Sequence, residues 1–351
     1  GPLVAGITDA FEAVGLKVFG PSKAAARLEG SKGFSKELMR KYKIPTAAFE
    51  RARTRDQAVA ILKRREPPIV IKADGLAEGK GVFVCRDYAE IDAALHAIYA
   101  EKRFGASGES CVIEDFMEGE EASLFVLTDG HAIMPLVVAQ DHKPLLDGDR
   151  GPNTGGMGSY APAPVLQGDK LDWVLKEIVV PTIHAMNHEG CPYRGLLYVG
   201  LMVQRRGAMV VEYNCRFGDP ETQALMMLMK SDILPLLLQV AEGKLLNDQE
   251  LEWHEGSSIG VVMASEGYPG AYPKGLPIAG LDELPDGVMA FAAGVKGSKT
   301  HPLTSGGRVL CVTARGEDLD SARDRVYAGI AKIHFEGAQF RRDIGHHALK
   351  T

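Results

Sequence analysis

The chain has 351 residues, of which 45% are hydrophobic and 25% charged, proportions that are typical of a globular protein and exclude a disordered or fibrous one. This length predicts about two to four domains. Lys and Arg number 40 against 46 Asp and Glu, a net charge of −6, which excludes a global basic field for nucleic acid or an anionic membrane surface.

The first 46 residues predict a helix, a short strand at residues 16–20 and a second helical stretch over 22–43. They look like the remainder of an α/β domain without its partner strands. From residue 47 to 117 the pattern runs helix, strand, glycine turn, strand and helix, and it closes on the strand "SCVIEDFM". We interpret this stretch as one small α/β module.

From residue 118 the signals change to antiparallel pairs. The segments "SLFVLT" and "AIMPLVVAQ" flank Asp129-Gly130, a favoured hairpin turn. "LDWVLKEIVVPTIHAMNHEG" predicts a helix, and "GLLYVGLMVQRRGAMVVEYN" predicts a second hairpin. Residues 118–254 therefore form a predicted central domain, and 255–351 a strand-rich C-terminal domain that ends in a helix.

The cysteines and the apolar segments indicate in which cellular compartment we expect the protein. The five cysteines include no C-x-x-C pair, which argues against a disulfide framework or a cysteine zinc site and favours a reducing cytoplasm. The apolar runs "LLYVGLMV" and "ILPLLLQVA" are far shorter than the ~20 residues that span a bilayer. No basic stretch precedes an apolar one at the N-terminus, so a signal peptide is not predicted.

Polar groups crowd the end of the predicted strand "MVVEYNC". Strand alternation places Glu212 and Asn214 on the same face. A carboxylate beside an amide oxygen suits Mg²⁺, although a solvent-facing sheet edge explains the same pattern. Arg216 follows directly, and a guanidinium next to a metal pair suits phosphoryl or acyl-phosphate chemistry, where negative charge grows in the transition state.

A glycine-rich turn joins two strand-like segments in "IVIKADGLAEGKGVFV". Its glycines, Gly75, Gly79 and Gly81, would let backbone N–H groups approach phosphates, with Lys72 and Lys80 alongside. The pattern is not G-x-x-x-x-G-K-[ST] and no helix follows at once, so a Walker-type loop is not predicted. We favour a mobile hairpin that covers phosphates over a glycine hairpin with two surface lysines.

Two further polar segments remain. In "VIEDFMEGEEAS" the carboxylates resemble a solvated face, but such groups also bind ribose hydroxyls while the neighbouring backbone binds an adenine edge. In "AQDHKPLLDGDRGPNTGGMGSYAP" the residues Asp141, His142, Lys143, Asn153 and Thr154 border several glycines. This loop is either an ordinary surface loop or a substrate-binding one.

Taken together, these segments resemble the ATP-grasp superfamily and, within it, the phosphoribosylamine–glycine ligase family. The matching stretches are "LEGSKGFSKELM", "VIKADGLAEGKGV", "VIEDFMEGEEAS", "QDHK", "GPNTGGMGSYAPAP", "VEYNCRFGDPETQ", "GGRVLCVTARG" and "FRRDIGHHA". They cover nearly the whole chain. The resemblance implies an α/β (α+β) ATP-grasp fold in which the 47–117 module is a lid over ATP.

The resemblance also implies site residues. Those implied to bind ATP are Lys32, Lys72, Gly75, Gly79, Lys80, Gly81, Glu114, Asp115, Phe116, Met117, Glu120 and Glu121, with adenine at 114–117 and ribose at Glu120 or Glu121. The implied metal ligands are Glu212 and Asn214, for Mg²⁺ or Mn²⁺. Those implied to surround glycine and the sugar amine are Asp141, Lys143, Asn153, Thr154, Gly155, Gly156, Met157, Gly158, Arg216 and Asp219, with Asp141, Lys143, Arg216 and Asp219 catalytic.

The implied reaction is the ATP-dependent ligation of glycine to 5-phosphoribosylamine through glycyl phosphate. We therefore expect small-molecule partners, no nucleic acid or membrane, a cytoplasmic location and a monomer or weak homodimer. Another ATP-grasp carboxylate–amine ligase, a biotin-carboxylase-like enzyme and a nucleotide-binding module without turnover are the alternatives. Family members begin with a further α/β segment, thought to help bind the sugar phosphate, which we do not find in these residues.

Overall fold

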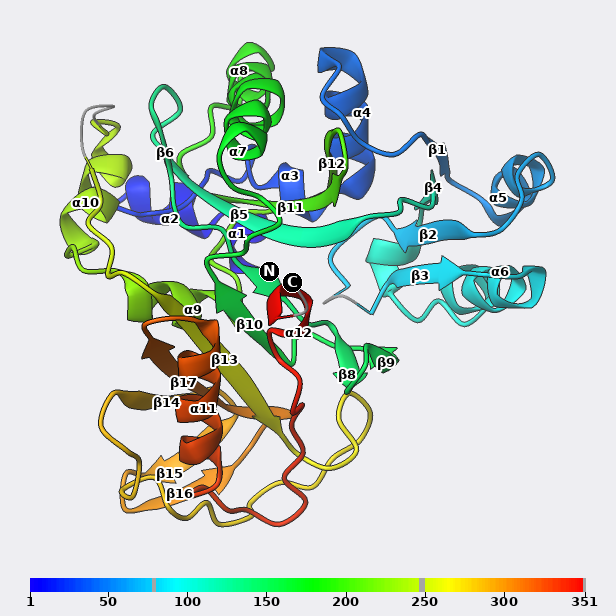
Figure 1. Ribbon diagram of the computed structural model, residues 1–351. Helices are drawn as coiled ribbons and strands as arrows, with labels where there is room; N and C mark the ends of the chain where they lie inside the picture. The colour runs from blue at the N-terminus through cyan, green and yellow to red at the C-terminus, as the bar shows by residue number, and fades with distance from the viewer. Residues whose placement is uncertain (78–79, 246–249, 350–351) are drawn as a thin grey trace. The chain divides into compact units, whose positions relative to one another are not determined.

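The computed structural model describes residues 1–77, 80–245 and 250–349, and it divides into two compact units. Unit 1 comprises residues 1–136, 166–217 and 233–249, and unit 2 comprises residues 137–165, 218–232 and 250–351. Both units combine helices with antiparallel sheets (Figure 1). The four domains expected from the sequence stay a prediction, since this division groups parts of 118–254 with the C-terminal residues.

Unit 1 contains the small module predicted at 47–117. Its antiparallel sheet has the order β1-β4-β2-β3, with β1 (Phe49–Ala52), β2 (Ile69–Ala73), β3 (Val82–Cys85) and β4 (Cys111–Asp115). The helices of the module are α5 (Arg55–Leu62) and α6 (Tyr88–Leu95), which continues as the π-helical turn η1 (His96–Ala100), and a short 3₁₀ helix η2 (Gly105–Gly108) follows.

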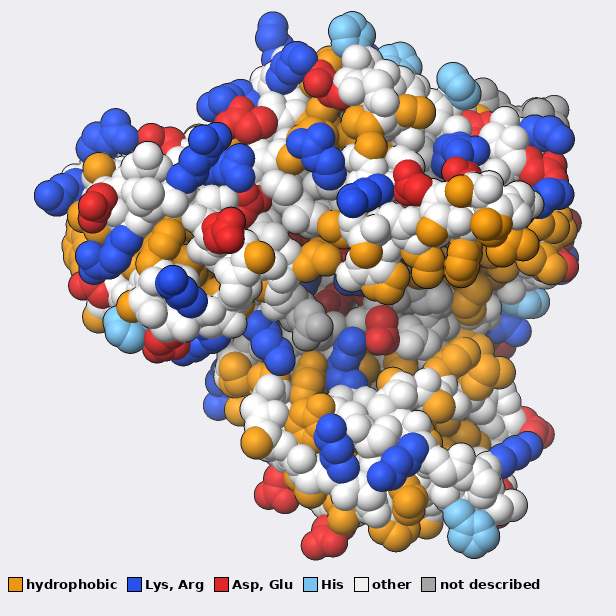
Figure 2. All heavy atoms as spheres, turned by 180° about the vertical axis from the view of Figure 1, so that it is seen from behind, with side chains coloured by type: hydrophobic (Ala, Val, Ile, Leu, Met, Phe, Trp, Pro, Cys, Tyr) orange, Lys and Arg blue, Asp and Glu red, His pale blue; other side chains and the backbone are white. Residues whose placement is uncertain are grey.

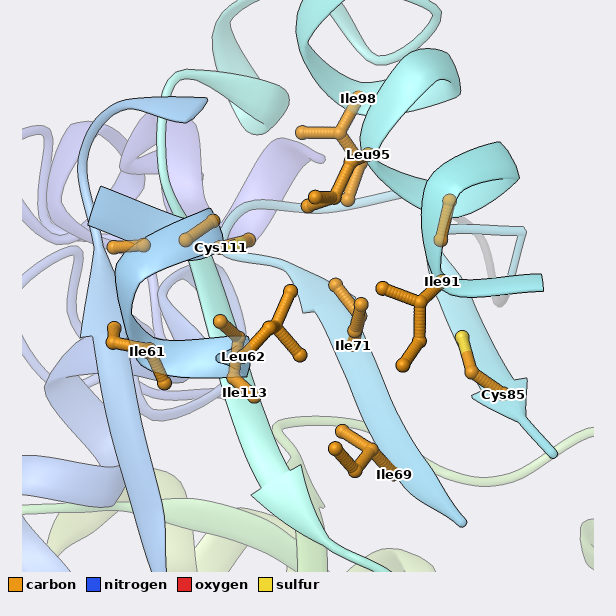
Figure 3. Close-up of a cluster of buried hydrophobic side chains, with 13 residues drawn as sticks. Ile61, Leu62, Ile69, Ile71, Cys85, Ile91, Leu95, Ile98, Cys111 and Ile113 are labelled. Carbon is orange, nitrogen blue, oxygen red and sulfur yellow. The ribbon is translucent and has the colours of Figure 1, made fainter. Parts of the chain in front are cut away.

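Strand alternation gives this sheet two different faces. One face is apolar and packs against α5 and α6, and Figure 3 shows Ile91 between Ile71 and Cys85. The other face carries the buried polar side chains of Lys72 and Glu114, on the neighbouring strands β2 and β4. The hydrophobic core of the module therefore fixes where this polar face lies.

The second sheet of unit 1 has the order β12-β11-β5-β6. Its strands are β5 (Glu120–Thr128), β6 (Ile133–Pro135), β11 (Gly195–Gln204) and β12 (Gly207–Asn214). The remaining helices of unit 1 are α1 (Pro2–Ala5), α2 (Ile7–Glu12), α3 (Arg27–Gly30), α4 (Lys32–Tyr42), α7 (Asp169–Val174), η3 (Leu175–Val179), α8 (Val180–His188) and α10 (Leu234–Glu242). The predicted hairpins are confirmed, and the helix predicted over 171–190 is observed over 169–188, with a π-helical turn at η3.

Three local predictions in unit 1 are wrong. Residues 16–20 form no strand, because no neighbouring strand pairs with them among the described residues. The helical stretch over 22–43 is broken at Ser31, whose extended backbone caps α4 through its side chain. The strand predicted over "AIMPLVVAQ" is interrupted: β6 ends at Pro135, the N–H of Leu136 makes one more bond to the carbonyl oxygen of Phe125 at 2.8 Å, and Gln140 already begins a strand of another sheet.

Unit 2 is built on a five-stranded sheet of order β14-β17-β13-β10-β7. These strands are β7 (Gln140–Asp141), β10 (Gly158–Ala161), β13 (Ser257–Ala264), β14 (Val288–Ala292) and β17 (Arg308–Gly316). Two small ribbons, β8 (Pro144–Leu146) with β9 (Arg150–Asn153) and β15 (Val295–Ser298) with β16 (His301–Thr304), and the helices α9 (Glu221–Leu228), α11 (Leu319–Ile330) and α12 (His346–Leu349) complete the unit.

The surface and the cysteines agree with the composition. Figure 2 shows Lys and Arg side chains interspersed with Asp and Glu side chains on the face that it displays. The five cysteines are free and buried. Within residues 1–77, 80–245 and 250–349, every helix lacks either the length or the apolar character needed to cross a bilayer.

Candidate active site

Unit 1 contains a buried carboxylate held between two lysines. The Oε2 atom of Glu114 lies 2.9 Å from Nζ of Lys36 and 3.1 Å from Nζ of Lys72. Lys72 also donates to the carbonyl oxygen of Val211 at 3.1 Å. The lysine thus joins the polar face of the 47–117 module to β12, the strand that ends in the predicted metal ligands.

Burial and the neighbouring charges shift the pKa values of Lys36 and Glu114 in opposite directions. Burial lowers the pKa of Lys36 to about 8, against the attraction of Glu114. Burial alone would raise the pKa of Glu114, but Lys72 and Lys36 together hold it below its ordinary value. The second oxygen of Glu114, Oε1, has no hydrogen-bond partner among the described residues, so this carboxylate can accept one further hydrogen bond.

Lys32 lies at the first position of α4, on the same face of the helix as Lys36. Its Nζ donates to the carbonyl oxygen of Gly75 at 3.2 Å. Burial lowers the pKa of Lys32, and Lys72 adds to that effect while Glu212 opposes it. Lys32 is thus within electrostatic reach of Lys72 and Glu212, and its role at a phosphate stays a prediction.

The carboxylate of Asp74 anchors the start of the glycine turn. Asp74 accepts hydrogen bonds from the backbone N–H of Gly33 at 2.7 Å and from the hydroxyls of Ser31 and Ser110, and it also pairs with Arg51. Although burial opposes it, these donors hold the pKa of Asp74 below its ordinary value. An ionised carboxylate at the N-terminus of α4 is stabilised by the helix dipole.

The glycine turn needs its first glycine for steric reasons. A Cβ atom on Gly75 would lie 2.6 Å from Oγ and 2.8 Å from Cα of Ser107. At the other end, the carbonyl oxygen of Gly81 accepts from the backbone N–H of Ala73 at 2.8 Å. Lys80 is exposed, and the predicted Gly79 lies outside the described residues. Backbone approach of a ligand to this turn stays a prediction.

The end of β12 brings the predicted metal ligands together. The amide nitrogen of Asn214 lies 3.5 Å from Oε1 of Glu212, and both side chains are half-buried. Arg216 donates toward Asn214 Oδ1 at 3.5 Å and lies 3.6 Å from the carboxylate of Glu29. Carboxylate and amide oxygens are the hard donors that Mg²⁺ and Mn²⁺ prefer, so this pair fits a divalent cation.

The segment predicted to hold adenine and ribose follows β4. Asp115 is exposed and pairs with Arg65 at 2.6 Å, and Phe116 is 41% exposed. Met117 is half-buried, while Glu120 and Glu121 begin β5. The structure thus places these residues on the connection from β4 to β5, beyond the buried Glu114. Their contacts with a nucleotide stay a prediction.

Unit 2 gathers the residues predicted for the other substrates. Asp141 ends β7, and its carboxylate lies 3.9 Å from Nζ of Lys143. The backbone N–H and the hydroxyl of Thr154 both donate to the carbonyl oxygen of Lys143, at 2.8 and 2.7 Å. Asn153 ends β9 and is exposed. The predicted long loop therefore contains an antiparallel ribbon, β8 with β9, which brings Thr154 back to Lys143.

Arg308 holds the glycine loop against Asp219. Its guanidinium donates to the carbonyl oxygens of Gly155 and Asp219, at 2.8 and 2.7 Å, and pairs with the Asp219 carboxylate at 3.0 Å. Gly156 has a φ of +111°, and a Cβ atom there would lie 2.5 Å from Cδ of Pro220. Met157 and Gly158, which complete the loop, are buried. Unit 2 therefore brings its predicted substrate residues into one group.

Sequence reasoning missed four residues of these groups. Lys36 follows Lys32 by one helical turn, and this spacing was a usable signal. Asp74 stands directly before the glycine turn, and this position was also a usable signal. Glu29 and Arg308 meet Arg216 and Asp219 only through the tertiary fold, and nothing in the local pattern indicates them.

Comparison with known proteins gives a consistent result. The chain matches the model of the phosphoribosylglycinamide synthetase ATP-grasp (A) domain over residues 30–222 and that of the phosphoribosylglycinamide synthetase C domain over residues 258–347. It is 48% identical to phosphoribosylamine–glycine ligase of Salmonella typhimurium over 353 residues, which cover 99% of this chain and 82% of that protein. The corresponding ligase of Rhizobium meliloti is 47% identical over 348 residues, with the same two coverages of 99% and 82%.

Solved structures agree with this match. The crystal structure of phosphoribosylamine–glycine ligase from Thermotoga maritima is similar with a TM-score of 0.85 and 40% identity, covering 93% of this chain and 82% of that one. Biotin carboxylase from Campylobacter jejuni has a TM-score of 0.72 at 16% identity, covering 98% of this chain and 75% of that one. At that identity the second similarity concerns the fold alone.

The buried lysine pair generates a prediction for stability. We expect Glu114→Gln to lower the free energy of unfolding by ~3–5 kcal/mol at pH 7, because it leaves two buried ammonium groups without their counter-ion. The neighbouring exposed pair gives a matched control: Asp115→Asn should cost only ~0–1 kcal/mol. Urea unfolding of both variants measures the difference, and equal losses would contradict the assignment.

The same pair sets the sign of the pH dependence. The pKa of Glu114 in the folded protein lies below its ordinary value of 4.5, so its stabilising contribution is present above that pH. The contribution is lost as the pH falls through the lowered pKa. The difference in stability between wild type and Glu114→Gln should accordingly shrink in acid.

The glycine loop of unit 2 generates a second prediction. We expect Gly156→Ala to destabilise unit 2 through an unfavourable positive φ, ~1–3 kcal/mol, and through crowding against Pro220 and Asp141, ~1–3 kcal/mol more. Gly275→Ala is the control, since Gly275 has a φ of +85° with no atom within 4 Å of the added carbon. Thermal unfolding measures both variants. An equal effect at the two positions would show that the loop tolerates the added carbon.

Proposed function

The chain belongs to the phosphoribosylglycinamide synthetase family, and on this premise we propose that it joins glycine to 5-phosphoribosylamine while ATP is converted to ADP and phosphate. The product is glycinamide ribonucleotide, an intermediate of purine biosynthesis. The enzyme is thus an ATP-dependent carbon–nitrogen ligase that uses ATP and a divalent metal ion. Mg²⁺ is the ion that we propose, with Mn²⁺ as its substitute.

Unit 1 supplies the groups for the nucleotide. We assign Lys32 and Lys72 to the phosphate oxygens. The ammonium group of each lysine is fixed by a hydrogen bond to a backbone carbonyl oxygen, Lys32 to Gly75 and Lys72 to Val211. We assign adenine to residues 114–117, where Oε1 of Glu114 has an unused acceptor position, and the ribose to Glu120 or Glu121. A metal ion held by Glu212 and Asn214 would neutralise negative charge on the phosphates.

Arg216 is the group that we assign to the transferring phosphoryl. Its planar guanidinium offers two parallel donors to a carboxylate or a phosphate, and it stands one residue beyond the buried Cys215, whose backbone N–H donates to Glu29 at 2.8 Å. Glu29 thus restrains both the backbone and the side chain at this strand end. Such a preorganised donor stabilises the charge that develops during transfer.

Unit 2 supplies the groups for glycine and the sugar amine. We assign to them Asp141, Lys143, Asp219 and the loop of Asn153, Thr154, Gly155, Gly156, Met157 and Gly158. Lys143 provides a positive charge for a carboxylate, and Asp141 and Asp219 provide acceptors for an amine. Arg308 acts through the loop that it holds and is a positioning residue.

The proposed chemistry balances in two steps. A carboxylate oxygen of glycine attacks the γ-phosphorus of ATP, the bond to the ADP oxygen breaks, and glycyl phosphate forms. The amine nitrogen of phosphoribosylamine then attacks the acyl carbon, the bond to phosphate breaks, and the amine loses a proton. Binding and orientation supply much of the rate enhancement in both steps.

One observation supports the proposal most directly. The pair Glu212 and Asn214 lies in the same unit as Lys32 and Lys72, and Lys72 is hydrogen-bonded to the strand that carries the pair. A cation and lysines grouped in this way suit phosphoryl transfer better than simple nucleotide storage. We also propose a cytoplasmic location and a monomer or weak homodimer, with no nucleic acid or membrane partner.

Phosphate release tests the function. Without hydroxylamine, the purified chain should release phosphate from ATP only when glycine and phosphoribosylamine are both present. When hydroxylamine replaces the amine, glycine hydroxamate and phosphate should form together. We expect Glu212→Gln and Asn214→Ala to slow turnover by ~10²-fold or more with the fold intact. The exposed Glu109→Gln is the matched control. Wild-type rates in Glu212→Gln at equal metal concentration would exclude the pair as metal ligands.

A second test concerns Arg216. We expect Arg216→Lys to lower kcat/KM by ~10²-fold, because a point charge cannot reproduce the planar pair of donors. Arg205→Lys is the matched control, since Arg205 is exposed in the turn between β11 and β12. Turnover within a few-fold of wild type in Arg216→Lys would mean that Arg216 is structural.

A further inference from the structure

Three histidines converge in unit 2, behind the substrate loop, since the backbone of His142 is hydrogen-bonded to Met157 and Gly158. One ring nitrogen from each of His142, His346 and His347 lies within 4.8 Å of the other two. His142 follows β7, and the other two begin α12, the last helix of the described chain. Figure 1 shows α12 beside β10, and the side chain of Ile344 approaches Gly158 at the start of that strand.

His142 is the member that demands an explanation. It is 2% exposed, its Nε2 accepts a hydrogen bond from the backbone N–H of Gly345 at 3.3 Å, and its Nδ1 has no hydrogen-bond partner among the described residues. Because a neutral imidazole that accepts at Nε2 carries its proton on Nδ1, this ring offers a cation its Nε2, in place of the long hydrogen bond from Gly345.

His346 is oriented as metal-binding histidines usually are. Its Nδ1 lies 3.0 Å from the carbonyl oxygen of Asp343, which leaves Nε2 directed toward the cluster. Histidine ligands of metals commonly use their second nitrogen in this way, and the bond fixes both the tautomer and the ring orientation. The rings of His346 and His347 lie side by side, with centroids 4.0 Å apart.

The charges around the cluster favour a cation. The Oδ2 atom of Asp149 lies 3.1 Å from Nε2 of His346 and 3.1 Å from Nε2 of His347. The buried guanidinium of Arg341 pairs with Asp149 and Asp343, at 2.9 and 2.7 Å. With neutral imidazoles, one arginine and two carboxylates leave a net charge of about −1 beside three nitrogen donors. A divalent cation is the ligand that this combination suits.

We propose that His142, His346 and His347 bind a borderline divalent transition-metal ion of the Zn²⁺ class, with Asp149 as the fourth ligand. Imidazole nitrogen suits this class, whereas the oxygen pair of unit 1 suits Mg²⁺ and Mn²⁺. Tetrahedral zinc holds its nitrogen ligands ~3.4 Å apart, so the rings need only small rotations to close around it. The ion would tie α12 to the residue between Asp141 and Lys143.

Cobalt is the probe for this site. The full chain is stripped of metal with a chelator and titrated with Co²⁺ alone, then with Zn²⁺ as competitor. We expect one equivalent of Co²⁺ to give the visible absorption of a four-coordinate ion without a thiolate charge-transfer band, and Zn²⁺ to abolish it. Absence of this spectrum at one equivalent of metal would overturn the proposal.

Variants assign the signal to the cluster. We expect His346→Gln and His347→Gln each to weaken Co²⁺ binding by ~100-fold or more, beyond the usual effect of a residue that only orients a ligand. His301→Gln, at an exposed histidine of unit 2, should bind as wild type does. Glu212→Gln should also keep the signal, which separates this site from the proposed site of the nucleotide's metal ion.

The outcomes remain decisive if a variant is unstable. His347 has a side chain that is 35% exposed, so its replacement should leave the metal-free unfolding midpoint unchanged. The wild-type midpoint should rise with Zn²⁺, and that of His347→Gln should not. Equal Co²⁺ affinity in wild type and His347→Gln, or an equal rise in both midpoints, would refute the proposal.

Discussion

The buried carboxylate of Glu114 is the interaction on which the rest of unit 1 depends. Two ammonium groups share one of its oxygens, and all three side chains are at most 4% exposed. Desolvating such charges is costly unless each finds a partner, so the elements that carry them are held at one separation. Lys36 belongs to α4, Lys72 to β2 and Glu114 to β4, and Lys72 reaches on to the backbone of β12.

This constraint links the glycine turn to the predicted metal pair. Lys36 also donates to the hydroxyl of Thr46, which in turn donates to the carbonyl oxygen of Val210, so both lysines lead to neighbouring residues of β12. The strand that ends in Glu212 and Asn214 is therefore held by side chains of the 47–117 module and α4. A phosphate site built on these contacts is preorganised before any ligand arrives.

The two units offer metal ions different donor atoms. The fold alone does not determine which ion or which reaction a unit supports. Biotin carboxylases share this fold at 16–20% identity, which shows how widely one architecture is used for different reactions. In unit 1 the donors are oxygens beside lysines, which suit a hard cation and phosphates. In unit 2 they are imidazoles beside paired carboxylates, which suit a softer ion.

The sequence by itself determined the elements whose signals are local. Strand alternation in "IVIKADG" and "VVEYN", the favoured turn at Asp129-Gly130 and the helix over 169–188 all reappear in the structure, because side-chain direction and turn chemistry depend on nearby residues. The family resemblance was readable for the same reason, since its motifs are short and continuous. The strand expected at 16–20 failed, because a strand also needs a partner in space.

Only the tertiary structure decided how distant charges pair. The family resemblance placed Glu114 in a nucleotide-binding segment, and the fold adds its burial between Lys36 and Lys72. The fold also pairs Arg308 with Asp219. It also brings His142 against His346 and His347. No sequence periodicity predicts such contacts, because the residues lie far apart in the chain and meet only when sheets and helices pack. Burial then makes an unpaired charge costly, so a buried charge requires a partner.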